Sequence, residues 1–552
     1  MGHLKRYRQI AGALVRHGLH YLVGVFGLER FVPFHKGMLA RGRPSPGHTP
    51  AEHVRMALED LGATFVKLGQ ILSTRPDLVP PEYLKELARL QDDAAPIPGD
   101  EAEGIVAEEL GAPVAELFLS FERAPLAAAS IGQAHAAVLR SGEEVVVKVR
   151  RPGVVEQVTE DIEIVRNLAL VASRRLGPAE HYDLIGLAEE FAETLRGELD
   201  YLREGRNAER FAEHFRGDPE VRIPRVYWEQ STASVLTLER IRGIKVDDTA
   251  ALDGAGIDRR QLARRIARVL LKMILEDGFF HADPHPGNFF VEPDGRLGVM
   301  DFGMVGVIDE AGRERLAMLL GALTSGDAER LVDTVLDMSA GRGRVDREEL
   351  KRDIQRLLTR YYELPLGQIP LGRMLEEALA AVRRHRLQLP SSLALLFRAL
   401  IVSEGLGLRL DPDFSLGPVL KPFAERLLLQ RYSPLRWAQR MGRAMIDTDH
   451  LLSELPRRLH RALKMLDRGG FEFGLRRESL EPMADRLERL ANRIVLGMIT
   501  AAFIIALSVL MLVYPPGGGE GHWGGTVFAV GLVAAAGLGV YLAWRIIRTG
   551  RG

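Results

Sequence analysis

The sequence predicts an α+β fold of two lobes, with a helical extension before them and a helical hairpin after them. Three observations carry this prediction. Short β-rich segments at 116–149 and 235–241 predict a small antiparallel sheet. Residues 311–430 follow the apolar spacing of helices. Two uncharged stretches, Ile494–Tyr514 and Gly524–Trp544, then come near the C-terminus.

Length and composition set limits on the function. The chain has 552 residues, which is long enough for more than one domain. It carries 73 Lys and Arg against 74 Asp and Glu, so its net charge of −1 gives no sign of a surface for nucleic acid. It contains no cysteine, which excludes disulfides, iron–sulfur clusters and thiolate zinc sites. Its N-terminal apolar run is cut by Arg16 and His17, which is not typical of a signal peptide.

The two C-terminal stretches are each long enough to cross a bilayer core of about 30 Å, which takes roughly 20 residues. Arginines flank the pair on both outer sides, whereas the loop 515–523 contains no Lys or Arg. The positive-inside rule puts the outer flanks in the cytoplasm and the loop outside. The sequence therefore predicts a transmembrane helical hairpin, and a helical hairpin buried in a soluble core is the alternative.

The strongest chemical signal lies in residues 281–303. Asp283 is followed five positions later by Asn288, and a turn at Pro293–Gly295 predicts a β-hairpin that ends at Asp301. Both loops would then meet at one end of the hairpin. Hard oxygen ligands suit Mg²⁺, which takes its other ligands from water and nucleotide phosphates. We therefore predict Asn288 and Asp301 as Mg²⁺ ligands and Asp283 as the group that orients or deprotonates the acceptor.

Lys148 lies in a run of valines that predicts a strand, and a cation there is costly unless it is paired. Glu198 falls inside the apolar stripe of a predicted helix that runs from Leu184 to Leu202. We predict a buried ion pair between Lys148 and Glu198 that positions nucleotide phosphates, with two separate solvated charges as the alternative. Asp200 points to the opposite face, so periodicity assigns it no role.

Residues 51–75 predict one helix whose apolar stripe leaves Lys67 and Gln70 on the other face, which ordinary solvation by itself explains. Two further segments would lie near the site. A strand over 235–241 ends the first lobe and would place Glu239 and Ile241 near an adenine pocket. An alanine-rich segment stands where a kinase has its glycine-rich loop, although alanine adopts positive φ less readily; it consists of Ala127, Ala128, Ala129 and Ser130.

The spacing of Asp283, Asn288 and Asp301-Phe302-Gly303 resembles the kinase pattern H-R-D-x-x-x-x-N followed by D-F-G. Ala282 replaces the arginine, and no A-P-E or long activation segment follows. We therefore expect no peptide-kinase activity.

With these motifs, the chain resembles the UbiB family of atypical kinase-like proteins over residues 50–430. The family motifs are Lys67-Leu68-Gly69-Gln70, Ala127 to Ser130, Lys148, Glu198-Leu199-Asp200, His281 to Asn288, Asp301-Phe302-Gly303, Leu389-Pro390 and Glu404-Gly405-Leu406.

The resemblance implies a two-lobed protein-kinase-like fold that binds Mg²⁺ with ATP or ADP, and ATPase rather than peptide-kinase activity. It implies a role in ubiquinone biosynthesis at the bacterial inner membrane, with the catalytic part in the cytoplasm. It also gives Lys67 and Gln70 an active-site role and lets the alanine-rich loop tune nucleotide preference. The partners it suggests are anionic phospholipid, prenylated quinone precursors, quinone-biosynthesis proteins and a second copy of the chain.

These signals predict a domain order. The expected parts are a basic helical segment, the extension with Lys67 and Gln70, the first lobe, the second lobe, a basic linker and two transmembrane helices, at 1–50, 51–115, 116–241, 242–430, 431–493 and 494–545. Two other functions stay open. His281-Ala282-Asp283 is an H-x-D that suits a non-haem iron hydroxylase of a quinone precursor, and a scaffold with an inactive site would keep the same motifs.

Overall fold

The computed structural model describes residues 2–32, 48–90, 95–176, 182–339, 345–361 and 369–431. All of them belong to one compact unit, residues 1–440. No helix in these ranges is both long and apolar enough to cross a bilayer. The predicted transmembrane helices, and the linker from residue 432 onward, lie outside the described residues.

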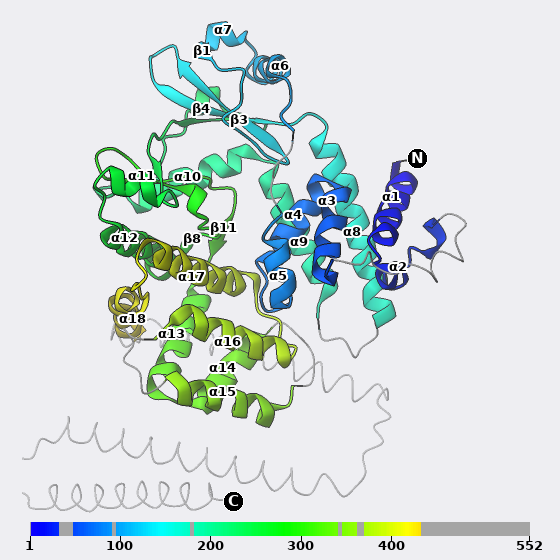
Figure 1. Cartoon of the computed structure of the whole chain (residues 1–552), viewed down its shortest axis with the longest axis vertical. Coiled ribbons are helices and arrows are strands. Elements are labelled where there is room, and N and C mark those ends of the chain that lie inside the picture. Colours follow the sequence, from blue (N-terminus) through cyan, green and yellow to red (C-terminus); the bar gives the residue numbers. More distant parts are fainter. Residues whose placement is uncertain are drawn as a thin grey trace, which may run out of the picture. The chain divides into compact units, whose positions relative to one another are not determined.

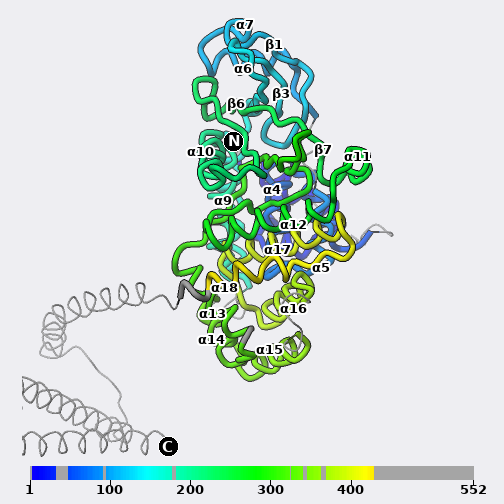
Figure 2. Tube along the Cα trace, turned by 90° about the vertical axis from the view of Figure 1, so that its left-hand side faces the viewer, coloured from blue at the N-terminus to red at the C-terminus, as the bar shows by residue number. Residues whose placement is uncertain are grey.

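The first lobe is built on the predicted antiparallel sheet. Its strands run in the order β1-β3-β4-β6, with β2 paired to β3; they are β1 (Phe118–Phe121), β2 (Ala127–Ala128), β3 (Gly132–Leu139), β4 (Glu144–Arg150) and β6 (Val235–Glu239). On β4, Val145, Val147 and Val149 are fully buried because alternate side chains share one face of a strand. Helices α6 (Gly99–Leu110) and α7 (Val114–Leu117) lie beside β1 in both views (Figures 1 and 2).

The second lobe contains the predicted hairpin, with Leu297 opposite Val291. Its two strands, β9 (Phe289–Val291) and β10 (Leu297–Val299), lie between β5 (Val221–Arg222) and β7 (Ile244–Lys245). A separate antiparallel pair, β8 (Phe279–His281) and β11 (Val305–Val307), brackets two loops: residues 282–288, called the catalytic loop below, and the loop with Asp301. Asp258 and Asp309 cap the helices that follow them.

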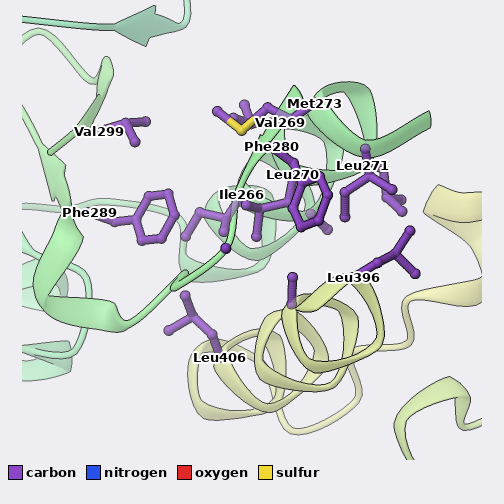
Figure 3. Close-up of a cluster of buried hydrophobic side chains, with 14 of the residues drawn as sticks. Ile266, Val269, Leu270, Leu271, Met273, Phe280, Phe289, Val299, Leu396 and Leu406 are labelled. Carbon is purple, nitrogen blue, oxygen red and sulfur yellow. The ribbon is translucent and has the colours of Figure 1, made fainter. Parts of the chain in front are cut away.

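Helices make up the rest of this lobe. They are α11 (Thr249–Gly254), α12 (Arg259–Leu271), α13 (Glu310–Ser325), α14 (Ala328–Met338), α15 (Arg347–Tyr361), α16 (Leu371–Arg384), α17 (Ser391–Leu410) and α18 (Gly417–Arg431). The short turns are η2 (Trp228–Gln230), the π-helical η3 (Lys272–Asp277) and η4 (Pro286–Asn288). Figure 3 shows how α12 and α17 enclose the strand before the catalytic loop: Leu270 and Leu396 lie around Phe280, which is fully buried. This core fixes the base of the candidate site.

The helix predicted over residues 51–75 is two helices, α3 (Pro50–Leu61) and α4 (Ala63–Ser73). Gly62 separates them with a φ of 88°, a backbone conformation that suits glycine because it has no Cβ. Apolar periodicity does not reveal this break, since residues on both sides keep a buried face. The extension also contains α1 (Gly2–Arg16), α2 (His20–Val25), η1 (Glu29–Phe31) and α5 (Pro81–Leu87).

The helix predicted through Leu202 also ends early. After α8 (Val154–Leu176), α9 covers Leu184–Glu198, and α10 (Tyr201–His214) is a separate helix. Asp200 lies between them as the N-cap of α10, where its side chain accepts a hydrogen bond from the backbone N–H of Leu202. Asp200 therefore has a structural role, and Glu198 is the last residue of its helix.

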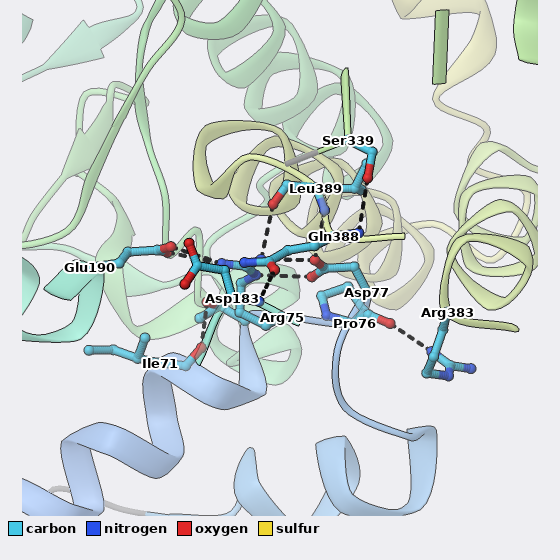
Figure 4. A network of polar contacts seen from close by, with 11 residues as sticks. Ile71, Arg75, Pro76, Asp77, Asp183, Glu190, Ser339, Arg383, Gln388 and Leu389 are labelled. Carbon is cyan, nitrogen blue, oxygen red and sulfur yellow. Dashed lines mark hydrogen bonds and ion pairs between the residues drawn. The ribbon is translucent and has the colours of Figure 1, made fainter. Parts of the chain in front are cut away.

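A buried polar network fixes the end of α4 (Figure 4). The Arg75 guanidinium contacts Asp77 at 2.9 Å, Glu190 on α9 at 3.0 Å and the Leu389 carbonyl at 3.0 Å. Asp77 in turn accepts from the Leu389 backbone N–H at 3.2 Å. Burial alone would lower the pKa of Arg75, but the two carboxylates outweigh it and raise that pKa. The network links the helical extension to α9 and to the segment before α17.

Candidate active site

A cavity of about 570 Å³ brings together most of the predicted site residues. Its walls come from α4, β2, β3, β4, α9, α10, the catalytic loop, the segment after Asp301 and α17. The predicted residues that line it are Lys67, Gln70, Ala127, Ala129, Lys148, Glu198, Asp283, Asn288 and Asp301. Segments far apart in the chain therefore meet at one place.

Lys148 is paired, but its partner differs from the predicted one. Its ammonium lies 2.5 Å from a Glu204 carboxylate oxygen and 3.7 Å from Asp301 Oδ1. The predicted Lys148–Glu198 pair is wrong because α9 ends at Glu198 and the next helix presents Glu204 to β4. Burial alone would lower the pKa of Lys148, but Asp301 and Glu204 outweigh it and raise that pKa.

Asp301 is held as a carboxylate. Lys148 lowers the pKa of Asp301 to about 2, against the opposing effect of partial desolvation within the cavity. Its backbone has a φ of 60°, an uncommon conformation for a residue other than glycine. Burial raises the pKa of Glu204, and Lys148 opposes this shift. One lysine therefore lies between an exposed carboxylate at the cavity and a buried one behind it.

Glu198 instead holds the helical extension. One of its carboxylate oxygens lies 3.2 Å from the ammonium of Lys67 on α4. Gln70, one turn further along α4, donates to the Leu90 carbonyl at 3.0 Å. Lys67 and Gln70 thus lie in the cavity wall on the face opposite the apolar stripe, and α4 covers one side of the site.

The catalytic loop is ordered by its own hydrogen bonds. Asn288 Nδ2 donates to the Asp283 carbonyl at 3.1 Å, which leaves its Oδ1 free to act as an acceptor. The Asp283 carboxylate accepts a hydrogen bond from Arg398 Nη2 at 3.3 Å. His281 is 1% exposed, and its Nε2 lies 3.2 Å from the Met300 carbonyl while its Nδ1 accepts from the Asp283 backbone N–H. His281 therefore supports the loop from below.

The alanine-rich loop is a short strand that turns back on β3. Ala127 and Ala128 form β2, and the Ala129 N–H donates to the Gly132 carbonyl at 2.8 Å. Of the four predicted residues, Ala128 and Ser130 are not part of the cavity lining, and Ser130 is buried. A Cβ at Gly132 would come within 2.1 Å of the Tyr201 hydroxyl, so β3 needs a glycine there. The loop therefore lines the cavity with the methyl groups of Ala127 and Ala129, and Tyr201 lines it as well.

The predicted adenine-pocket residues lie elsewhere. The Glu239 carboxylate pairs with Arg222 and accepts from the Arg225 backbone N–H. Ile241 packs against Gly298, where an added Cβ would come within 2.8 Å of it. Neither side chain is part of the cavity lining. The prediction for Glu239 and Ile241 is therefore not supported by the positions of their side chains.

Comparisons with known proteins show the family of the chain. Residues 89–335 match the ABC1 atypical kinase-like domain, residues 354–415 the UbiB helical domain, and residues 478–548 the ABC1/UbiB kinase-like C-terminal domain. The "Probable protein kinase UbiB" of Xanthomonas campestris pv. campestris is 34% identical, over 93% of this chain and 94% of its own length. The chain belongs to the UbiB family.

Two further similarities accompany this assignment to the UbiB family. An uncharacterized protein from Synechocystis is 36% identical, over 84% of this chain and 80% of its own length. The solved structure titled as a complex of Rv3197 with erythromycin from Mycobacterium tuberculosis is 26% identical and covers 66% of this chain and 93% of its own, with a TM-score of 0.46.

Two residues of this UbiB-family site were missed by the sequence predictions. Glu204 had a usable signal, because it shares the buried face of α10 with Tyr201, Ala208 and Phe211. A carboxylate on such a face needs a counter-charge. Arg398 had no such signal, because its contact with Asp283 joins residues 115 positions apart.

Proposed function

We propose that this UbiB-family chain is a membrane-anchored ATPase or small-molecule kinase that binds Mg-ATP and serves prenylated-quinone synthesis. One observation supports this above all: Lys148, Asp283, Asn288 and Asp301 line a single cavity between the two lobes. Phosphoryl transfer depends mainly on positioning and charge stabilisation, and these residue types supply both.

The donor set fits a Mg²⁺ ion. Asp301 is ionised across the working pH range, since its pKa is lowered to about 2. Asn288 keeps a carbonyl oxygen for a ligand because its amide nitrogen is already bound to the Asp283 carbonyl. Two protein oxygens leave most positions for water and phosphate, as Mg²⁺ prefers. When bound, the ion would neutralise charge on the phosphates.

The remaining residues have separate tasks in this proposal. Lys148 contacts the nucleotide phosphates, and Glu204 holds its ammonium in place from the buried side. Asp283 orients the acceptor and takes its proton. Lys67, Gln70 and Ser73 on α4 form part of the cavity wall, and this covering favours water or a small molecule over a peptide as the acceptor.

The hydrogen bonds of His281 weaken the alternative of a non-haem iron hydroxylase. Both ring nitrogens of His281 already have hydrogen-bond partners, so the H-x-D motif does not present an imidazole to a metal. In the described ranges, no group of three His, Cys, Asp or Glu side chains is arranged to hold a metal ion. The scaffold alternative keeps every contact seen here, and only turnover separates it from the ATPase.

The membrane part of the proposal rests on sequence and family. The stretches 494–514 and 524–544 both lie within residues 478–548, the region that matches the ABC1/UbiB kinase-like C-terminal domain. We propose that they anchor the chain in the bacterial inner membrane beside anionic phospholipid. Quinone-biosynthesis proteins, prenylated precursors and a second copy of the chain are the partners that this location favours.

The test is nucleotide hydrolysis by the full-length protein in detergent, with and without anionic lipid and quinone precursors. We expect Mg²⁺-dependent turnover that falls by at least about 100-fold in Asp301→Asn, because the amide lacks the charge that holds the metal. The matched control is Asp294→Asn, a change in the exposed turn of the β-hairpin. Equal turnover in the wild type and Asp301→Asn would contradict the assignment of Asp301 as a metal ligand. No turnover in either protein would favour a scaffold with an inactive site.

A further inference from the structure

The catalytic cavity contains a cation from outside the kinase-like motifs. Arg398 lies on α17, in the region that matches the UbiB helical domain, and its Nη2 reaches Asp283 Oδ1 at 3.3 Å. Its side chain is 21% exposed and lines the cavity. Within the described part of the chain, Asp283 is its one hydrogen-bonding partner. A guanidinium has five N–H donors, and the bond to Asp283 uses one of them.

The catalytic loop itself supplies no such charge. Residues 281–288 read His-Ala-Asp-Pro-His-Pro-Gly-Asn, without Lys or Arg. The other cations of the cavity are already engaged: Lys67 with Glu198, and Lys148 with Glu204 and Asp301. Arg398 is therefore the cation that sits directly at the carboxylate assigned to the acceptor. That is where negative charge develops when a phosphoryl group moves between its donor and acceptor oxygens.

We propose that Arg398 is a catalytic residue whose guanidinium contacts the phosphoryl group during transfer, so that the helical domain completes the active site. The inference rests on the proposed function. With water as acceptor, the water oxygen bonds to the γ-phosphorus, and the bond from that phosphorus to the β–γ bridging oxygen breaks. ADP leaves with the electron pair, and Asp283 takes the proton of the water. Arg398 stabilises the charge on the transferring oxygens.

The protonation state is compatible with this role. Burial lowers the pKa of Arg398, and Asp283 opposes the shift. Arginine nevertheless stays charged in proteins, and its planar fork contacts two phosphate oxygens at once. A lysine at this position would keep the charge and lose that geometry. A residue that only positioned Asp283 would instead tolerate lysine.

The experiment compares full-length wild type, Arg398→Lys, Arg398→Met and the control Arg409→Met, an exposed arginine on the same helix. Three quantities are measured: kcat for ATP, the affinity for Mg-ADP, and the affinity for Mg-ADP with aluminium fluoride, which mimics the transferring phosphoryl group. We expect Arg398→Met to lower kcat by at least about 100-fold, and Arg398→Lys by about tenfold or more. Both variants bind Mg-ADP like the wild type and lose the tighter binding of the aluminium fluoride complex. Arg409→Met changes nothing.

Each outcome decides a separate question. A wild type that neither binds nor hydrolyses ATP overturns the proposed function itself. An active wild type with Arg398 variants that keep the aluminium fluoride affinity overturns the role of Arg398. Full activity in Arg398→Lys reduces Arg398 to a positioning residue and also overturns the proposal. If Arg398→Met does not fold, the lysine variant, checked by its melting temperature, decides alone.

Discussion

The site depends on how one buried lysine is shared between two carboxylates. Glu204 is buried behind Lys148, whereas Asp301 faces the cavity with a side chain that is 54% exposed. The buried partner is costly to ionise without the lysine, so Lys148 and Glu204 stabilise each other. The exposed partner keeps its oxygens available to a ligand. Because of this division, Glu204 fixes the ammonium of Lys148 from the buried side while the ammonium still faces the cavity.

We expect Glu204→Gln to lower the free energy of unfolding by about 1–3 kcal/mol, less than for a fully buried pair because Lys148 keeps Asp301. A double-mutant cycle with Lys148→Met, measured by chemical denaturation, should give a coupling energy in the same range. The matched cycle pairs Lys148→Met with Glu198→Gln and should give a clearly smaller coupling, since Glu198 contacts Lys67. Equal coupling in both cycles would contradict the assignment of Glu204.

For single residues, the sequence predicts that Lys148 needs a carboxylate partner, but it does not predict which carboxylate this is. A lysine among valines requires a carboxylate, and that inference is confirmed. The choice of Glu198 failed because it assumed that one helix continued past residue 198. The helix does not continue, because Asp200 is the N-cap of a new helix, α10. Aspartate is a favoured N-cap residue, so its side chain is consistent with this break.

Among the elements, the two breaks at Gly62 and Asp200 place the helical extension over the site. The turn at Gly62 starts α4 in a new direction, and the end of α9 leaves Glu198 facing Lys67. The Arg75 network then fixes the other end of α4. Apolar spacing predicts which residues are buried here. It does not predict where the helices change direction, because a break leaves the buried face nearly continuous.

We expect Gly62→Ala to destabilise the protein by roughly 1 kcal/mol, because a Cβ is strained at a φ of 88° although no atom lies within 4 Å of it. The matched control is Gly104→Ala within α6, where the added Cβ also meets nothing within 4 Å but the backbone is helical. That change should stabilise by about 0.5–1 kcal/mol. Thermal denaturation of the two variants checks the prediction, and effects of the same sign would refute it.

For the whole molecule, the sequence motifs predict both lobes and the two loops that contain Asp283 and Asp301, because each is a local pattern of a few residues. The hairpin register and the strand with Lys148 follow directly from alternation and turn residues. Contacts between distant segments are different. The pairing of Arg398 with Asp283, and of Arg75 with Glu190, depends on how the elements pack, and a single sequence carries no trace of it. The site is complete only when the extension, the lobes and the helical domain are assembled.

The compact unit formed by residues 1–440 leads to a last prediction. Every residue assigned to the site lies in this unit, and compact units often fold independently. We therefore expect a fragment of residues 1–440 to hydrolyse ATP with the kcat of the full chain.

We also expect this fragment to leave the membrane fraction, because it lacks both uncharged stretches, Ile494–Tyr514 and Gly524–Trp544. Ultracentrifugation of cell extracts, with the full chain as control, measures the second effect. A folded fragment that still sediments with membranes would mean that another segment, such as the basic α1, holds the protein there, and the anchor assignment would fail.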